Sequence, residues 1–276
     1  MRTEANICVV VVNYFNEEEV AGFVTDCLLA QEGVLLNVII VDNGSWDSSK
    51  LTSLRSDKIT VLNPGKNLGY LHAFLFAWEQ IRSAFSEVPA FIVLSNSDIE
   101  FAGKHVFKDM VQYHSRTDFA CIGPSVFSTL QNIEQNPFAS QRISRRRLKT
   151  INFFQSAYPL YLIYQGLSLL KNKLRSGKKV LQSSGTAREV YAIHGSFMIF
   201  SAKFMHEEAA KLTKAPFLFG EELYVAEVAR KSGYRSYFDN RLSVFHREHA
   251  TTRIFKSRSM VRLLHESTSR ILKEFY

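Results

Sequence analysis

Residues 91–101 read FIVLSNSDIEF, and this stretch decides the fold class. Four consecutive apolar residues, Phe91–Leu94, are followed at once by a polar turn that contains Asp98. A short unbroken apolar run is typical of a strand covered on both faces, as in a parallel sheet. In open sheets of this kind, ligands bind beyond the carboxyl ends of the strands. The stretch therefore predicts a buried strand with a candidate site at its end.

The same pattern occurs twice earlier in the chain. Ile7–Val12 is a continuous apolar run that leads into Asn13, and Val38–Val41 leads into the turn cluster 42–45 (DNGS). Between them, Asn16–Ala30 has the apolar spacing of a helix packed on one side. Strands that alternate with helical patterns indicate βαβ units. We therefore expect an α/β fold with a mostly parallel central sheet.

The composition is that of an ordinary globular protein. Of 276 residues, 46% are hydrophobic and 22% charged, which excludes disordered, collagen-like and coiled-coil proteins. The three cysteines are far apart and form no CxxC pair, so we expect a reducing, cytoplasmic compartment and no structural zinc site. The sequence predicts neither a signal peptide nor a transmembrane helix.

The net charge of +8 favours a polyanionic partner, and the basic residues are unevenly distributed. Residues 141–149 and 171–179 are strongly basic, and the segment 151–170 between them is apolar and aromatic. One interpretation is a solvated basic loop around a packed helix. The other is a peripheral membrane element for an anionic leaflet, since apolar surface flanked by Lys and Arg suits that interface. We find no nucleic-acid-binding motif and expect no nucleic-acid partner.

Seven ordered stretches of the chain resemble the family 2 glycosyltransferases, which have the GT-A fold. The closest similarity is to the bacterial rhamnosyltransferase-like branch, which adds sugars to surface glycans. The stretches are VVVVNYFNEEE (9–19), IIVDNGSWDSS (39–49), NPGKNLGYLHAF (63–74), FIVLSNSDIEF (91–101), IHGSFMIFS (193–201), FLFGEELYVAEVARKSGYRSYFD (217–239) and SVFHREHATT (243–252).

The resemblance implies one GT-A domain over residues 1–276, built as an αβα sandwich. The nucleotide-binding half would be 1–125, the basic and aromatic helical insert 126–190, and the acceptor and catalytic half, with a C-terminal helix, 191–276. It implies an inverting transfer of a sugar from a nucleotide-diphosphate donor to a hydroxyl of a glycan or lipid-linked acceptor. The expected setting is synthesis of a bacterial surface polysaccharide, O-antigen or capsule, at the inner face of the cytoplasmic membrane.

The resemblance also assigns the donor side. Asp42 would bind the base, and the NxG segment would close over the nucleotide. The donor-binding residues carried over are Asn13, Tyr14, Asp42, Asn43, Gly44, Asn67, Gly69, Asn96 and Ser97.

Asn96-Ser97-Asp98 occupies the place of the family's DxD motif, with Asn in the first position. Asp98 therefore keeps the one carboxylate, and His246 matches the histidine that can complete metal or diphosphate binding. Mg²⁺ sites often use one or two carboxylates together with phosphate oxygens, so a Mg²⁺ or Mn²⁺ cofactor is expected. A strict metal requirement stays open because of Asn96.

Glu221-Glu222 matches the family's acidic pair, and Glu222 is the expected general base with Glu221 as the alternate. The alternative, purely structural interpretation is that two acidic residues stabilise the N-terminus of a helix. Gly195 and Ser196 lie where the family places its acceptor-side loop.

Two alternative functions have related folds. A nucleotidyltransferase would need a Gly-rich, Lys-bearing loop after the first strand, and residues 12–16 offer none. A catalytically impaired nucleotide-sugar-binding protein of the same fold stays open, because Asn96 and Glu222 both depart from the family pattern.

Overall fold

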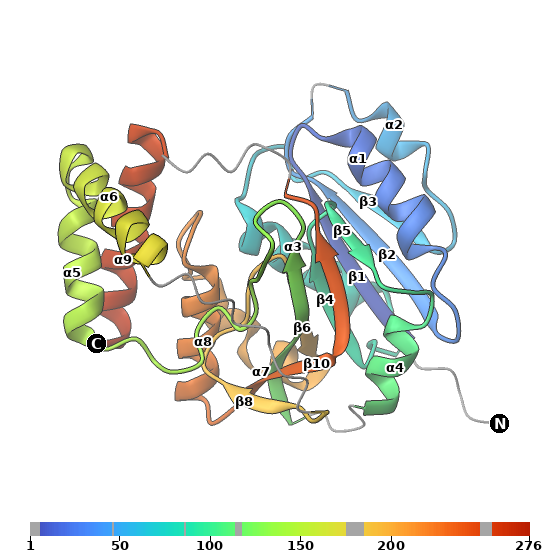
Figure 1. Ribbon diagram of the computed structural model, residues 1–276. Helices are drawn as coiled ribbons and strands as arrows, with labels where there is room; N and C mark the ends of the chain where they lie inside the picture. The colour runs from blue at the N-terminus through green and yellow to red at the C-terminus, as the bar shows by residue number, and fades with distance from the viewer. Residues whose placement is uncertain (1–5, 46, 86, 114–117, 175–184, 249–255) are drawn as a thin grey trace.

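The computed structural model describes residues 6–45, 47–85, 87–113, 118–174, 185–248 and 256–276. These residues form one ten-stranded sheet with helices on both faces (Figure 1). The strands are β1 (Asn6–Asn13), β2 (Leu35–Asp42), β3 (Ile59–Leu62), β4 (Phe91–Ser95), β5 (Ile99–Phe101), β6 (Phe119–Ser128), β7 (Ile133–Glu134), β8 (Arg188–Val190), β9 (Phe197–Ser201) and β10 (Arg235–His246). The helices are α1 (Glu17–Gly22), η1 (Phe23–Leu28), α2 (Ser49–Thr52), α3 (Tyr70–Ala84), α4 (Val106–Tyr113), α5 (Arg145–Gln155), α6 (Tyr158–Leu174), α7 (Ala202–Leu212), α8 (Glu221–Lys231) and α9 (Arg258–Phe275).

The strand order is β3-β2-β1-β4-β9-β6-β10-β5, with β7 beside β6 and β8 beside β10. Strands β3, β2, β1 and β4 are parallel to their neighbours in this block, and β6 is parallel to β10. Strand β9 lies antiparallel between β4 and β6. The predicted α/β class with a mostly parallel central sheet is confirmed.

Strand β1 is buried on both faces, as its apolar run predicts. Cys8 and Val10 belong to the core that also contains residues of α3, α7 and α8. Val9 and Val11 belong to the opposite core, with residues of α1, η1 and α4. All four have no exposed surface. The sheet is thus the middle layer of an αβα sandwich, since each face buries its own apolar side chains against helices.

The first helix differs from the single α-helix predicted over Asn16–Ala30. It continues as the π-helix η1, and the Leu29 N–H then donates to the Val24 carbonyl at 3.0 Å. Val20, Val24 and Leu28 recur every fourth residue and are all fully buried. A π-helical turn is wider than an α-helical one and keeps this spacing on one face. Packing against the sheet therefore sets the local helix geometry.

Two antiparallel pairings bring distant segments to the turn after β4. Ser95 in β4 lies opposite Phe197 in β9, so the residues just before β9 reach that turn. His246 in β10 lies opposite Ile99 in β5, which follows the turn directly. The sequence pattern alone did not assign β5, β6 or β9.

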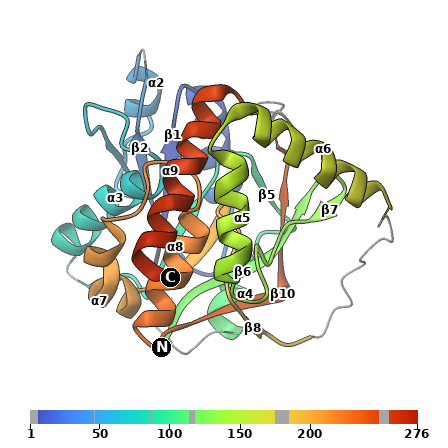
Figure 2. The same ribbon diagram turned by 90° about the vertical axis from the view of Figure 1, so that its left-hand side faces the viewer.

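The basic and aromatic insert contains a helical pair, α5 and α6. Helix α5 lies side by side with α9 in both views, and α6 leaves the end of α5 and runs away from it (Figures 1 and 2). Asn152 Nδ2 donates to Ser269 Oγ at 2.8 Å, and Thr268 Oγ1 donates to Gln155 Oε1 at 2.7 Å. No helix in the described parts of the chain is long and apolar enough to cross a membrane. Residues 175–179 of the second basic run lie outside the described residues.

Arg142 behaves differently from the basic residues that follow it. Its Nε donates to buried Glu227 at 2.6 Å, and its Nη2 donates to the Phe275 carbonyl at 3.0 Å. It therefore joins the insert to α8 and α9, while its side chain stays 37% exposed. Arg145–Arg147, at the start of α5, are exposed as expected.

Candidate functional site

The ends of β1 and β2 lie side by side and share one polar cluster. Asn13 is paired with Asp42 in the parallel register, and both residues are buried. Asn13 Nδ2 donates to Asp42 Oδ1 at 3.1 Å and to Ser45 Oγ at 2.9 Å, and Ser45 Oγ–H donates to Asp42 Oδ1. The Asp42 carboxylate is therefore fixed at the sheet edge, where a ligand lying over the strand ends could reach it.

Tyr14 follows β1 and is 57% exposed, although it is a large aromatic residue. A Cβ on Gly44 would lie 3.1 Å from two carbons of its ring, so glycine in the second turn lets the ring lie against the backbone. An exposed aromatic face at this edge is a surface on which a nucleobase can stack.

Asn43 connects the second turn to the NxG segment. Its Nδ2 donates to Asn67 Oδ1 at 2.9 Å, and its Oδ1 accepts from the Leu68 N–H at 2.8 Å. Gly69 has a φ of +81° and a Cβ there would lie 2.0 Å from the Phe217 carbonyl oxygen, so only glycine fits. The Asn43 amide is thus used inside the protein, where it shapes the segment from Asn67 to Gly69.

The turn after β4 is held from two sides. The Asn96 N–H donates to the Ser196 carbonyl at 2.9 Å, which joins this turn to the loop before β9. On the other side, Ser97 Oγ–H donates to Glu19 Oε1 in α1. Asn96, Ser97 and Ser196 therefore lie together at the end of β4.

Asp98 and His246 meet at the end of this turn. His246 Nε2 lies 3.1 Å from Asp98 Oδ1, and the Arg247 N–H donates to the Asp98 carbonyl at 2.9 Å. Two ligands of one Mg²⁺ at about 2.0–2.1 Å and at right angles would be about 3 Å apart. The pair therefore fits a divalent cation that takes its other ligands from phosphate and water. Within the described residues no three His, Cys, Asp or Glu side chains form a complete metal site.

Glu221 and Glu222 begin α8 after a left-handed turn. Gly220 has a φ of +76°, and a Cβ there would lie 2.5 Å from Ser267 Oγ. The Phe219 N–H donates to Glu221 Oε1 at 3.0 Å, so that carboxylate bends back over the turn. Glu222 points the other way, because a Cβ on Gly195 would lie 3.0 Å from its Oε1.

Both carboxyl groups favour the protonated form more than an ordinary glutamate does. Burial and the neighbouring charge of Glu222 raise the pKa of Glu221 to about 8. Burial also raises the pKa of Glu222, against hydrogen bonds from its own N–H and from that of Gly195, which act to lower it. A carboxylate with a raised pKa is a stronger base, which is what removal of a hydroxyl proton requires.

Tyr70, in the first turn of α3, links these groups into one site. Its hydroxyl donates to the Gly195 carbonyl at 3.2 Å. Burial raises the pKa of the hydroxyl well above its usual range, and the charges of Asp98, Glu221 and Glu222 raise it further. The charges of Asp98 and of the acidic pair of α8 therefore both act on this part-buried hydroxyl.

His194, just before the acceptor-side loop, is a neutral side chain at physiological pH. Burial, and then the charge of His246, lower its pKa to about 4. Its Nδ1 lies 2.9 Å from Ser196 Oγ, and the two histidine rings are 6.1 Å apart, edge to face. Ser196 is itself buried, so the loop presents mainly the Gly195 backbone toward Glu222.

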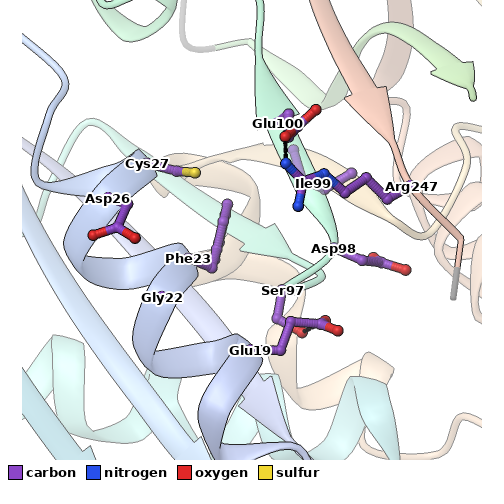
Figure 3. A pocket seen from close by; sticks show the side chains of 10 residues that line it. All are labelled: Glu19, Gly22, Phe23, Asp26, Cys27, Ser97, Asp98, Ile99, Glu100 and Arg247. Carbon is purple, nitrogen blue, oxygen red and sulfur yellow. Dashed lines mark hydrogen bonds and ion pairs between the residues drawn. The ribbon is translucent and has the colours of Figure 1, made fainter.

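A pocket of about 240 Å³ lies on the other side of the turn after β4, beside α1 and η1 (Figure 3). Figure 3 shows Glu19 and Ser97 together at one end of it, and an ion pair between Arg247 and Glu100 at the other.

Comparison with known proteins identifies the family. A model of Glycosyl transferase family 2 matches residues 9–175, which include most of β1, the turns after β2 and β4, and the insert as far as residue 175. The chain belongs to glycosyl transferase family 2. A search of curated proteins gave no match. These matches show the family and do not separate its rhamnosyltransferase-like branch from its other branches.

Two solved structures of similar fold are complexes of other glycosyltransferases. The mannosyltransferase PcManGT from Pyrobaculum calidifontis, in complex with GDP-Man and Mn²⁺, is 12% identical, with a TM-score of 0.57 over 99% of this chain and 66% of its own. GalNAc-T7 with UDP, GalNAc and Mn²⁺ is 12% identical, with a TM-score of 0.55 over 89% of this chain and 44% of its own. The family 2 chain thus spans less than two thirds of either neighbour, and the likeness establishes the GT-A fold.

Three residues that contact the site, Tyr70, Gln135 and Glu248, carry no signal in the sequence pattern. Tyr70 lies next to Gly69 in the quoted stretch 63–74, but its role depends on the fold. Gln135 is far from His246 in the sequence and contacts it only in the folded chain. Glu248 follows His246 by two residues and contacts Gln135. Burial opposes ionisation of Glu248, but hydrogen bonds from Ser128, Gln131 and Gln135 outweigh it and lower its pKa.

Proposed function

We propose that this chain is an inverting glycosyltransferase that moves a sugar from a nucleotide-diphosphate donor to a hydroxyl acceptor. One observation carries the proposal: the loop before β9 contacts the turn of Asp98 through the Ser196 carbonyl, which accepts from the Asn96 N–H at 2.9 Å, and contacts Glu222 through Gly195. A cation-binding carboxylate and a carboxyl pair of raised pKa thus lie at one place, which is the combination that this reaction needs. The two neighbours of the same fold were solved with a nucleotide or nucleotide sugar and Mn²⁺.

In the proposed reaction Glu222 is the general base. Its carboxylate accepts the proton of the acceptor hydroxyl as that oxygen attacks the anomeric carbon. The bond from that carbon to the diphosphate oxygen breaks on the opposite face of the sugar, which inverts the configuration. The raised pKa of Glu222 brings its basicity closer to working pH, and Gly195, which donates its N–H, fixes the direction of the carboxylate.

The donor would lie over the ends of β1, β2 and β4. In this arrangement Tyr14 stacks on the base, Asp42 accepts its hydrogen bonds, and Asn13, Gly44 and the Asn43–Asn67–Gly69 segment form the surrounding wall. Asn96 and Ser97 approach the ribose and diphosphate. A bound Mg²⁺ or Mn²⁺ on Asp98 and His246 would neutralise the charge that develops on the departing diphosphate.

The decisive experiment is a thermal-shift and hydrolysis screen over uridine-, thymidine- and guanosine-diphosphate sugars, with Mn²⁺, Mg²⁺ or EDTA. A ligand that binds the native state raises the melting temperature, so the cognate donor should do so more with metal than with EDTA. Asp98→Ala should remove the metal-dependent part. A metal effect that persists in Asp98→Ala would overturn the metal assignment. Donor binding without any turnover would favour the nucleotide-sugar-binding protein instead.

We further propose that the acceptor is a glycan carried on a lipid diphosphate, in O-antigen or capsule synthesis on the cytoplasmic face of the bacterial membrane. The insert supports this. Phe153, Ile163 and Leu167 are 55–60% exposed, and Arg145–Arg147 lie exposed on the same helical pair. Apolar side chains beside basic ones suit an anionic bilayer surface, where each basic residue adds about 1 kcal/mol.

Co-sedimentation with liposomes tests the membrane part. We expect binding to vesicles that contain anionic lipid, weaker binding at high salt, and release when Arg145–Arg147 are changed to Gln. Ile163→Ser with Leu167→Ser should also release the protein, whereas the same change at the exposed but distant Leu130 should not. Binding that is indifferent to lipid charge and salt would refute it.

A further inference from the structure

His246 makes a contact with each of its two ring nitrogens, and the two contacts differ in kind. Nε2 lies 3.1 Å from Asp98 Oδ1, toward the proposed cation position. Nδ1 lies 2.7 Å from Gln135 Oε1, on the side away from Asp98. A neutral imidazole has one N–H and one lone pair, and only the lone-pair nitrogen can bind a metal. The partner of Nδ1 therefore decides whether Nε2 can be a ligand.

Glu248 determines which end of the Gln135 amide faces His246. Gln135 Nε2 donates to Glu248 Oε1 at 2.5 Å. An ionised carboxylate accepts hydrogen bonds and donates none, so the amide NH₂ must face Glu248 and the amide oxygen must face His246. An amide oxygen accepts, so Nδ1 carries the proton. When a cation lies between Nε2 and Asp98 Oδ1, the ring therefore binds it through the Nε2 lone pair; without a cation, Asp98 Oδ1 accepts a hydrogen bond from Nε2.

Glu248 is itself held in place. Its carboxylate also accepts from Gln131 Nε2 at 2.8 Å and from Ser128 Oγ at 2.6 Å, and the residue is 7% exposed. Its backbone φ of +45° is uncommon for a residue with a side chain. Ser128 is paired with His246 between β6 and β10, so the carboxylate and the imidazole are fixed to the same two strands.

We propose that Gln135 and Glu248 are positioning residues that lock His246 in the Nδ1–H form, with Nε2 ready for the cation. Partners on the far ring nitrogen of a metal-binding histidine orient the ring and increase its basicity, and their loss typically costs 10–100-fold in metal affinity. In this chain the partner is a glutamine whose own orientation is set by a buried carboxylate. The inference rests on the proposed function only in taking a divalent cation as the ligand.

The test uses two readouts on the full chain, neither of which is turnover. Long-range ¹H–¹⁵N spectra of ¹⁵N-histidine-labelled protein, at alkaline pH and with excess Mg²⁺ to occupy the Asp98 side, report which nitrogen of His246 carries the proton; His246→Gln assigns the signal. Electron paramagnetic resonance of free Mn²⁺ gives the Kd for the metal alone. We expect the Nδ1–H form in the unmodified chain.

Glu248→Gln should convert part of the His246 signal to the Nε2–H form and weaken Mn²⁺ binding at least tenfold, and Gln135→Leu should do the same. Glu208→Gln is the matched control, because Glu208 is also buried and accepts from Ser232 Oγ at 2.6 Å in a different part of the fold. It should change neither readout.

An Nε2–H signal in the unmodified chain would overturn the proposal. So would a folded Glu248→Gln or Gln135→Leu protein that keeps the Nδ1–H form and the original Kd for Mn²⁺. Gln135 is partly exposed, so its variant provides the test if Glu248→Gln does not fold. The Nδ1–H form with no Mn²⁺ binding would instead count against the proposed metal site, and the tautomer response to the variants would still decide the positioning role.

Discussion

Helix α8 has two acidic sites of opposite character. At its N-terminus, burial raises the pKa of Glu222, and the groups that act against this are backbone N–H groups. Further along, Glu227 is also buried, but hydrogen bonds from Arg142, Tyr191 and Arg230 outweigh the burial and lower its pKa. The three donors reach it at 2.6, 2.7 and 2.8 Å. The comparison shows that the donors around a buried carboxylate, and not burial alone, decide the sign of its pKa shift.

The two sites therefore suit different tasks. Glu227 joins α8 to the loop before α5, to Tyr191 just after β8 and, through Arg142, to the end of α9, so it contributes to the packing of the second half of the chain. Glu222 has no such anchoring in the contacts described for it, and it faces Gly195 and the acceptor-side loop. Substitution of Glu222 should therefore reduce activity with little change in stability, and substitution of Glu227 should reduce stability.

The largest effect is expected for Glu222→Gln. Loss of a general base typically costs 10²–10⁴-fold, so kcat should fall by about that factor while the melting temperature and donor affinity change little. Steady-state kinetics with the donor found in the screen, together with a thermal melt, measure both. Unchanged turnover would remove Glu222 from the base role, and Glu221→Gln would then be the variant to test.

Glu227→Ala should instead lower the free energy of unfolding by about 3 kcal/mol, the low end for a broken buried ion pair, because both arginines can turn toward water. Urea denaturation measures the loss. Glu207→Ala is the control: Glu207 is exposed and accepts only from the Tyr234 hydroxyl among the contacts described, so less than about 1 kcal/mol is expected. Equal losses in the two variants would contradict the anchoring role.

Gly195→Ala should reduce kcat about tenfold without unfolding the protein. Its Cβ would lie 3.0 Å from Glu222 Oε1, so the carboxylate must move by a few tenths of an ångström from its working position. Gly166→Ala is the matched control, because a Cβ there meets nothing within 4 Å. If Gly195→Ala keeps full activity, contact with the Gly195 backbone does not fix the direction of the base.

A pH titration of stability sharpens the comparison further. The folded-state pKa of Glu221 is raised to about 8 from 4.5, so the native state keeps a proton that the unfolded state loses. Stability should therefore fall as pH rises from 4.5 to 8, by at most about 1.4 kcal/mol per pH unit. The lowered pKa of Glu227 acts oppositely: its contribution is present above 4.5 and is lost as pH falls through the folded-state value. Glu221→Gln should reduce the loss of stability between pH 4.5 and 8 and leave the loss at acid pH, which comes from Glu227, unchanged.

The sequence predicted those parts of the fold that depend on local pattern. Runs such as Ile7–Val12 and Phe91–Leu94 must be buried on both faces, and the polar residues that end them must then share one edge. The register between distant strands is not encoded locally. Asp98 and His246 meet because β5 pairs with β10, and Tyr70 contacts Gly195, 125 residues further along the chain. Their chemistry could be anticipated from family resemblance, but their contacts could not.

Gly69 has one more consequence. Its backbone lies against the Phe217 carbonyl, so the segment proposed to cover the nucleotide touches the loop that leads into Glu221 and Glu222. If this segment moves when the donor binds, Glu221 and Glu222 would therefore move with it. We therefore expect ordered binding, with the donor before the acceptor substrate, since Glu222 would take its final position only after the nucleotide has bound.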